Sequence, residues 1–367
     1  MKLSAYAALT GLAVIAAVTS TNTAATIAPN EVKPEQNYKV RASWNWGLRK
    51  LDSDQAWKLT RGNKKIVVAI IDTGVDMNHP DLKANLWTNP KEAPNGIDDD
   101  GNGLIDDIHG WNFVDNDDDI SDRHGHGTHI AGIIGANGPS LQGVAPEVSL
   151  MILKYFDPKS ANQNPLTNTV NAIRYAVRMG ADIINYSGGG LASSREEYDA
   201  ISEASEAGIL FVAAAGNEKS DSDKRSYYPA DYLLPNILSV TAIDPRAQVL
   251  PSSNWGENTV DIAAPGEDIF STLPGGEHGY MTGTSQATAF ATGVAVLVKA
   301  SHPELRTPSA VIKHLLETGE FARDHAGKTR SRTTLNSYRA LAMKPIGTDA
   351  NGNAIEAKDG DLLRFSF

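Results

Sequence analysis

The sequence contains no cysteine among its 367 residues. This excludes disulfide bonds, a thiolate nucleophile and any metal site with cysteine ligands. It also lacks an excess of positive charge, since 33 lysines and arginines stand against 44 aspartates and glutamates. A chain with a net charge of -11 has no basic surface of the kind that nucleic acid requires. We therefore expect no nucleic-acid partner.

Long hydrophobic runs are also missing, because no apolar stretch reaches the ~20 residues that a membrane span requires. The longest run, Ala5–Val18, follows the positive charge of Lys2 and leads into small residues up to Ala25. This order of charge, apolar run and small residues is typical of a secretory signal peptide. We expect residues 1–25 to be removed, the protein to be secreted (extracellular or periplasmic), and no stable membrane association.

The negative charge is concentrated in one segment. Residues 92–122 contain eleven aspartates and glutamates and no lysine or arginine. The other 33 acidic residues equal the 33 basic ones, so the rest of the chain is neutral. This segment therefore needs an explanation of its own.

Part of the acidic segment has the spacing of a calcium-binding loop. Side-chain oxygens occur at the first, third, fifth and ninth positions, and glycine at the sixth. The twelfth position is His109 and not a glutamate, so an ordinary EF-hand is not expected. The spacing predicts structural Ca²⁺ bound by Asp98, Asp100, Asn102 and Asp106; the alternative is a solvated acidic loop.

Short apolar runs alternate with helical patterns from Trp44 onward. The expected strands are residues 66–71, 149–154, 183–186, 209–214, 237–243 and 260–263. The expected helices are residues 170–179, 194–207, 285–300 and 308–317, the last with Thr307 as N-cap and Pro308 in its first turn. Continuously apolar strands separated by helices predict an α/β fold: a mostly parallel central sheet with helices on both faces, in three layers.

This pattern defines the expected domain organisation. Residues 26–43 form a short N-terminal pro or linker segment, and residues 44–342 form one domain that contains an acidic insertion at 88–122. Residues 343–367 form a polar C-terminal tail with one edge strand expected near its end.

Four polar residues lie where such a sheet binds ligands, beyond the carboxyl ends of its strands or at the start of a helix. Asp72 ends the first strand, Asn217 follows another, His126 is flanked by glycines, and Ser285 begins a long Ala/Val-rich helix. A serine hydroxyl becomes nucleophilic when an imidazole accepts its proton, and a carboxylate orients that imidazole. An asparagine amide can stabilise the oxyanion that follows.

The motifs around these residues, in this order along the chain, resemble the subtilisin-like serine proteases, or subtilases. The resemblance extends from Trp46 to Ala342. The matching stretches are Val68–Asp76, His126–Gly132, Gly143–Pro146, Ala214–Glu218 and Gly283–Ser285.

The resemblance implies a secreted serine endopeptidase that works through an acyl-enzyme intermediate. Its catalytic residues would be Asp72, His126, Ser285 and, in the oxyanion hole, Asn217. Substrate would lie along Ser187, Gly188, Gly189 and Gly216, where glycines let a substrate strand pair with exposed backbone. We expect a monomer that acts on proteins or peptides and a roomy pocket for large apolar side chains before the cleaved bond.

Two features depart from the family or leave alternatives open. The loop between Gly132 and Gly143 is short, which puts in doubt a calcium site that many relatives form there, although Asp81 matches one of its ligands. The histidines 124, 126 and 129 also suggest a metallohydrolase, and a catalytically inactive binding module is the third reading. The metallohydrolase alternative explains neither Ser285 nor Asn217, and the presence of all three triad residue types argues against the inactive module.

Overall fold

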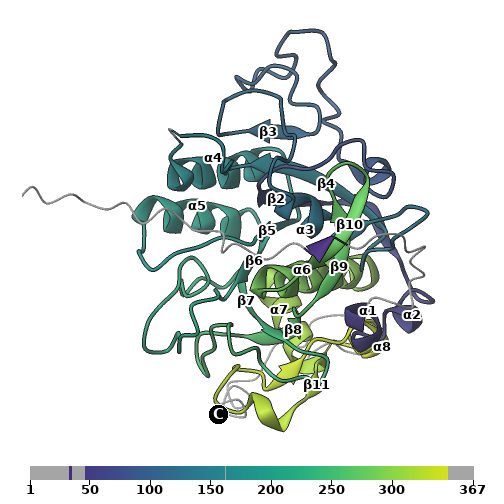
Figure 1. Cartoon of the computed structure of the whole chain (residues 1–367), viewed down its shortest axis with the longest axis vertical. Helices are drawn as coiled ribbons and strands as arrows, with labels where there is room; N and C mark the ends of the chain where they lie inside the picture. Colours follow the sequence, from purple (N-terminus) through teal and green to yellow (C-terminus); the bar gives the residue numbers. More distant parts are fainter. Residues whose placement is uncertain (1–32, 35–45, 162, 346–367) are drawn as a thin grey trace, which may run out of the picture.

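The computed structural model describes residues 33–34, 46–161 and 163–345 (Figure 1). The predicted signal peptide lies outside these residues, as do most of the predicted linker and most of the C-terminal tail with its edge strand. None of the described helices is both long and apolar enough to cross a membrane.

A nine-stranded sheet forms the centre of the described chain, in the order β11-β12-β8-β7-β6-β5-β2-β4-β3. Neighbouring strands are parallel except β11 and β12. The strands are β2 (Gly62–Asp72), β3 (Gly110–Asn112), β4 (Glu147–Lys154), β5 (Ile183–Tyr186), β6 (Leu210–Ala214), β7 (Ile237–Ile243), β8 (Ile262–Pro265), β11 (Glu320–Phe321) and β12 (Thr333–Thr334). The predicted mostly parallel sheet is confirmed.

Helices cover both faces of this sheet, as expected. In Figure 1, α4 and α5 lie on one side of β2 and β5, and α3 and α6 lie on the other. The helices are α1 (Trp46–Lys50), α2 (Ser53–Ala56), α3 (His126–Gly135), α4 (Pro165–Arg178), α5 (Arg195–Glu206), α6 (Thr284–Ser301), α7 (Pro308–Thr318) and α8 (Ser337–Ala342), with 3₁₀ turns η2 (Lys83–Asn85) and η3 (Arg323–His325).

The central strands contain continuous apolar runs where they are buried from both sides. Along β2, Val68 and Ile70 pack into the core beneath α3 and α6, whereas Ala69 and Ile71 pack beneath α4 and α5. Successive side chains of a strand point to opposite faces, so a strand between two helix layers needs apolar residues throughout. This is the reason that the continuous apolar runs predicted the fold.

Helix ends follow local signals in the sequence. Thr307 caps α7 by accepting a hydrogen bond from the Ala310 N–H at 3.3 Å, and Pro308 occupies the first turn. Asn164 caps α4 in the same way, ahead of Pro165. The predicted N-terminus of α7 is thus confirmed.

A second, antiparallel sheet was not predicted. It contains β1 (Lys33–Pro34), β10 (Glu277–Met281) and β9 (Ile269–Leu273), in the order β1-β10-β9. Ser271 Oγ and Thr272 Oγ1 of β9 each donate a 2.7 Å hydrogen bond to a carbonyl oxygen of α3. This sheet therefore supports the helix that begins at His126.

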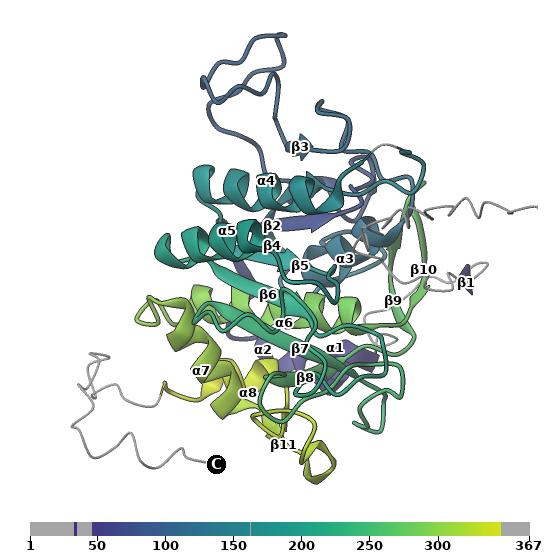
Figure 2. The same ribbon diagram turned by 90° about the vertical axis from the view of Figure 1, so that its left-hand side faces the viewer.

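The acidic insertion, residues 88–122, contains only the short strand β3 among otherwise irregular backbone. Its loops rise above α4 and β3 at the top of both views (Figures 1 and 2). β3 pairs with β4, so the segment is attached to the edge of the central sheet.

Candidate active site

Three neighbouring strands bring polar residues to one edge of the sheet. β2 ends at Asp72, β5 is followed by Ser187, and β6 is followed within three residues by Asn217. The three strands are adjacent and parallel in the order β2-β5-β6, so their carboxyl ends meet. The N-termini of α3 and α6, two helices that pack on each other, carry His126 and Ser285.

Asp72 and His126 form a buried, hydrogen-bonded pair. Asp72 Oδ1 lies 2.7 Å from His126 Nδ1 and also accepts the Thr73 N–H at 2.8 Å. Asp72 is 2% exposed and His126 is fully buried. Burial opposes protonation of the imidazole, but the charge and hydrogen bond of Asp72, together with the charge of Asp122, outweigh burial and raise the pKa of His126. The carboxylate thereby fixes the ring so that Nε2 is the free acceptor.

Close backbone approach makes this pairing feasible. A Cβ atom on Gly127 would lie 2.2 Å from the Gly74 carbonyl oxygen and 3.2 Å from Asp72 Cβ. Only glycine at position 127 lets the start of α3 reach the end of β2.

Asp122 holds the start of α3 in place, a role that the sequence analysis missed. Its Oδ1 accepts from the N–H groups of His124 and Gly125 and from Thr73 Oγ1, at 2.8–2.9 Å. Its Oδ2 accepts from the N–H and hydroxyl of Thr128 at 2.9 and 2.7 Å. Asp122 was counted only as one of the acidic residues, although an aspartate just before a helix is itself a capping signal.

Ser285 lies in the first turn of α6 and is 4% exposed. Its hydroxyl donates to the Ser187 carbonyl oxygen at 3.2 Å and not to His126. His126 Nε2 is buried and has no hydrogen-bond partner within the described residues. The imidazole acceptor is therefore free, and a rotation about the Ser285 side chain is needed before it can accept a proton; such contacts commonly tighten only when substrate binds.

Asn217 is oriented by the same helix. Its Oδ1 accepts from the Thr284 N–H at 3.0 Å and from Thr284 Oγ1 at 3.2 Å. Because the amide oxygen is engaged in this way, Asn217 presents its NH₂ group as a donor. Its position beside the residue before Ser285 suits an oxyanion-stabilising role.

The predicted substrate-binding glycines border a tyrosine ring. A Cβ on Gly189 would lie 2.4 Å from Tyr227 Cε1, and a Cβ on Gly216 would lie 3.0 Å from Tyr227 Cδ1. Tyr227 is only 6% exposed. Gly188 likewise faces the Tyr155 hydroxyl, 2.4 Å from its would-be Cβ. The space beside these glycines is thus filled by an aromatic side chain, and the expectation of a roomy pocket has to be revised.

The three histidines that suggested a metallohydrolase, His124, His126 and His129, do not face a common point. His129 Nε2 is 3.0 Å from the Ile269 carbonyl oxygen, and burial lowers the pKa of His129 to about 3. His126 faces Asp72, and the centroids of the His124 and His126 rings are 6.2 Å apart. Among the described residues, the three histidines do not form a group that could hold a metal ion.

The acidic insertion brings some of the predicted calcium ligands together. Carboxylate oxygens of Glu92, Asp98 and Asp100 lie within 4.8 Å of one another. Asp106 instead accepts hydrogen bonds from the N–H groups of residues 95 and 96, and Asn102 donates from its amide to Asp107 at 2.9 Å. Glu92, ahead of the EF-hand-like spacing, was not among the predicted ligands.

Comparisons with known proteins identify the relatives of this chain. The sequence model of the subtilase family matches residues 63–347. The chain is 34% identical to a thermophilic serine proteinase of Bacillus sp. (strain AK1) over 72% of its length, and spans 62% of that relative. It is 36% identical to the major intracellular serine protease of Bacillus subtilis (strain 168), over 70% of this chain and 76% of that one. Among solved structures, an epidermin leader peptide processing serine protease from Staphylococcus aureus matches 85% of this chain and 83% of its own, with a TM-score of 0.69 and 26% identity.

Proposed function

The chain belongs to the subtilase family of serine proteases, and on that premise we propose that Asp72, His126 and Ser285 are its catalytic triad. The observation that carries this assignment is the buried 2.7 Å contact between Asp72 and His126 at the edge of the sheet where α6 presents Ser285. In the part of the chain that the structure describes, His126 Nε2 has no hydrogen-bond partner. The protein hydrolyses peptide bonds as an endopeptidase.

In the first step, the Ser285 hydroxyl turns from the Ser187 carbonyl to His126 and transfers its proton to Nε2 as Oγ attacks the substrate carbonyl carbon. Asp72 stabilises the imidazolium that forms, because its carboxylate lies against Nδ1. His126 then protonates the leaving amine and the acyl-enzyme remains. Water, deprotonated by His126, releases the acyl group in the second half of the reaction.

Asn217 and the Ser285 backbone N–H supply the oxyanion hole in this proposal. Both groups lie at the N-terminus of α6, where backbone N–H groups have no partner inside the helix and favour negative charge. Asn217 is kept in the donating orientation by Thr284.

The substrate strand lies along Ser187, Gly188, Gly189 and Gly216. Because the Tyr227 ring fills the space next to Gly189 and Gly216, we infer a preference for small side chains before the cleaved bond. This replaces the preference for large apolar residues that the glycines alone predicted.

A serine-directed covalent inhibitor tests the triad. The wild-type protein should be labelled once per chain at Ser285 and lose peptide hydrolysis, whereas Ser285→Ala should be neither labelled nor active. His126→Ala should prevent labelling too, and the double variant should behave like either single one. Normal proteolysis by Ser285→Ala would refute the assignment.

Export is proposed from the signal-like pattern of residues 1–25 alone. A relative in Bacillus subtilis is named an intracellular protease, so the two locations have to be distinguished directly. N-terminal sequencing of the protein from its native host, together with cell fractionation, does so. A mature protein that begins after Ala25 and lies outside the cytoplasm is expected, and an intact Met1 in the cytoplasm would contradict export.

We also infer that the acidic insertion binds a structural Ca²⁺ ion through Glu92, Asp98 and Asp100. The donor set contains oxygens only, as calcium prefers, and Glu92 Oε2 is a buried atom without a hydrogen-bond partner within the described residues. The ion would neutralise neighbouring carboxylates and order the loop; it takes no part in the chemistry.

A further inference from the structure

Gln286, the residue that follows Ser285, has a buried amide that the proposed mechanism does not use. It lies in the first turn of α6 and is fully buried. Neither its Oε1 nor its Nε2 has a hydrogen-bond partner within the described residues. A buried amide without partners lowers the stability of the fold, and an apolar side chain of the same length would avoid this cost. An unpaired amide next to the nucleophile therefore calls for a functional explanation.

The amide of Gln286 and the amide of Asn217 border the same point beside Gly283. A Cβ atom on Gly283 would lie 3.2 Å from Gln286 Oε1 and 3.6 Å from Asn217 Nδ2. The backbone of Gly283 is extended, with φ 160°, so no left-handed conformation requires glycine at this position. A side chain here would instead press on both amides. The glycine thus leaves the region that the two amides share accessible to a small polar group.

The two amides are complementary as donor and acceptor. Asn217 Oδ1 is held by the N–H and the hydroxyl of Thr284, at 3.0 and 3.2 Å. The Asn217 NH₂ group has two hydrogens, and one N–H is enough to bind the oxyanion of the substrate. The other N–H needs an acceptor. Gln286 Oε1 is an acceptor on the side of Gly283 and has no other partner in the part of the chain that the structure describes.

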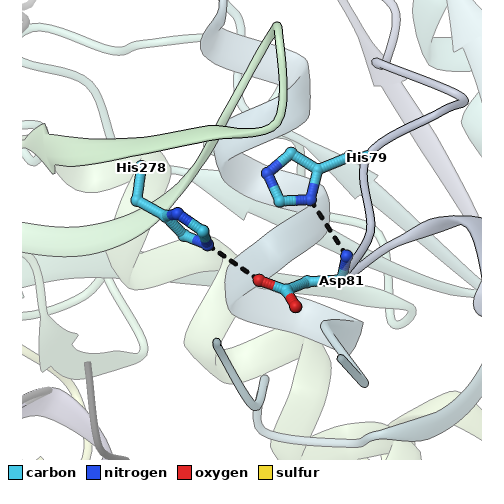
Figure 3. A group of neighbouring side chains, drawn as sticks. All are labelled: His79, Asp81 and His278. Carbon is cyan, nitrogen blue, oxygen red and sulfur yellow. Dashed lines mark hydrogen bonds and ion pairs between the residues drawn. The ribbon is translucent and has the colours of Figure 1, made fainter. Parts of the chain in front are cut away.

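The β9–β10 hairpin, which leads into α6, is fixed to the segment that follows β2. Figure 3 shows Asp81 pointing toward His278 of β10, with the ring of His79 beside them. Asp81 Oδ2 lies 2.7 Å from His278 Nε2, and His79 Nε2 donates to the Glu277 carbonyl oxygen at 3.0 Å. These contacts restrain the chain just before α6, so the Gln286 amide is presented from a rigid element, as a positioning role requires.

We propose that Gln286 is a positioning residue of the oxyanion hole. Its Oε1 accepts, through one water molecule beside Gly283, the N–H of Asn217 that does not face the oxyanion. A water bridge between two such amides is enthalpically nearly as good as a direct hydrogen bond. The Asn217 amide is then held by Thr284 at Oδ1 and by Gln286 at Nδ2, so its remaining N–H is preorganised for the oxyanion. This inference rests on the proposed oxyanion hole.

Gln286→Met tests the proposal, because methionine has nearly the same shape and no amide. For a peptide substrate, kcat per titrated active site should fall about 10-fold with KM unchanged, since the oxyanion forms only in the transition state. Binding of a peptide aldehyde, whose adduct with Ser285 places an oxygen in the oxyanion hole, should weaken by a similar factor. The melting temperature should not fall, because the volume of the side chain is conserved. An unchanged kcat would overturn the proposal.

A double-mutant cycle with Asn217→Ala determines whether Gln286 acts through Asn217. Asn217→Ala alone should lower kcat about 100-fold or more, and adding Gln286→Met should cause no further loss. Independent effects, which multiply in the double variant, would refute a role through Asn217. If Asn217→Ala leaves kcat unchanged, the proposed oxyanion hole fails together with this inference. If only Gln286→Met leaves kcat unchanged, the oxyanion hole stands and this inference alone fails.

Asn236→Leu is the control for the loss of a buried amide elsewhere. Asn236 is fully buried, and its Nδ2 donates to the carbonyl oxygens of Ile201 and Ile209 at 3.3 and 3.1 Å. It directly precedes β7, so it lies at the amino end of the strand and the active site lies at the opposite edge of the sheet. This variant should lower the melting temperature and leave kcat per titrated active site unchanged. Equal losses of kcat in Asn236→Leu and Gln286→Met would refute the positioning role.

Discussion

Two groups of carboxylates in this molecule have opposite surroundings. At the catalytic edge, Asp72 and Asp122 are almost completely buried and accept hydrogen bonds from segments about fifty residues apart. In the acidic insertion, carboxylates such as that of Asp98 accept mainly from N–H groups a few residues further along the same loop. The first arrangement joins separate elements, and the second shapes only its own turn; within the insertion Asp107 is an exception, since it accepts from the Tyr175 hydroxyl of α4.

This difference indicates which carboxylates carry function. The number of charges in a segment does not indicate function, because the insertion has most of the excess negative charge but contains none of the proposed triad residues. Burial together with donors from distant segments holds an oxygen in one position, which catalysis requires. Asp122 belongs to the acidic segment by sequence and to the catalytic edge by its contacts.

The largest effect is expected for Asp72→Asn. We expect kcat to fall about 10⁴-fold, because the imidazolium loses its stabilising carboxylate and the imidazole its orientation. The acid limb of the pH profile of kcat/KM should also move to lower pH. The Asp72 carboxylate raises the pKa of His126, so its removal lets the imidazole lose its proton at lower pH. Steady-state assays with a peptide substrate measure both effects.

Asp98→Asn in the insertion is the control for this comparison. It removes a carboxylate of the same type and should leave kcat and the acid limb unchanged at saturating calcium. An acid limb that stays in place in Asp72→Asn would show that this carboxylate does not face the proton-accepting histidine.

Asp122→Asn should reduce kcat by about 10- to 100-fold, with little change in KM. The amide can replace only some of the accepted hydrogen bonds, and a buried donor left unpaired costs roughly 1–3 kcal/mol. The Asp122 charge also raises the pKa of His126, so the acid limb of the pH profile should move to lower pH in this variant as well. A mere loss of stability would not move the acid limb, so this shift distinguishes the two explanations.

Asp107→Asn is the matched control for Asp122. Asp107 is fully buried too, but it lies in the acidic insertion and accepts from the Tyr175 hydroxyl and the Asn89 amide. Its substitution should lower the melting temperature without altering kcat per titrated active site. Equal losses of kcat in the two variants would remove the distinction between the regions.

The sequence predicted what depends on local pattern. Apolar runs predicted the sheet, because a strand between two helix layers is apolar throughout, and the residues after Asp72 and Ala214 could be placed at one edge from topology alone. Thr307 and Pro308 predicted the start of α7. Predicting these features does not require knowing which distant residues pack against them.

Features that depend on distant contacts could not be predicted in this way. Tyr227 lies in an irregular segment, and its ring reaches Gly189 and Gly216 only through tertiary packing. His79 and His278 are almost two hundred residues apart, so their spacing could not predict the contact between their rings. The β9–β10 hairpin was overlooked because its short strands, in particular Glu277–Met281, mix polar and apolar residues.

Tyr227→Gly should change specificity more than rate. Removing the ring opens the space beside Gly189 and Gly216, so kcat/KM for substrates with phenylalanine before the cleaved bond should rise about 10-fold or more relative to alanine. Matched peptides that differ only at that residue provide the measurement. Tyr175→Phe, which alters a buried tyrosine away from these glycines, should leave the ratio unchanged. A wild-type enzyme that already prefers phenylalanine would contradict the small-pocket inference.

The smallest effect on catalysis, and the one confined to the insertion, is expected from calcium removal. Chelation should lower the melting temperature by a few degrees, since an ion at a hundredfold its Kd stabilises the folded state by about 2.7 kcal/mol. It should expose residues 92–122 to self-cleavage while kcat per titrated active site stays constant.

Asp98→Asn combined with Asp100→Asn should remove the response, and Asp99→Asn should keep it, because Asp99 lies outside the carboxylate group of the site. Added calcium, and not zinc, should restore the melting temperature. If the melting temperature in chelator equals that in millimolar calcium, the insertion is a solvated loop whose carboxylates, unlike those of the catalytic edge, hold nothing in place.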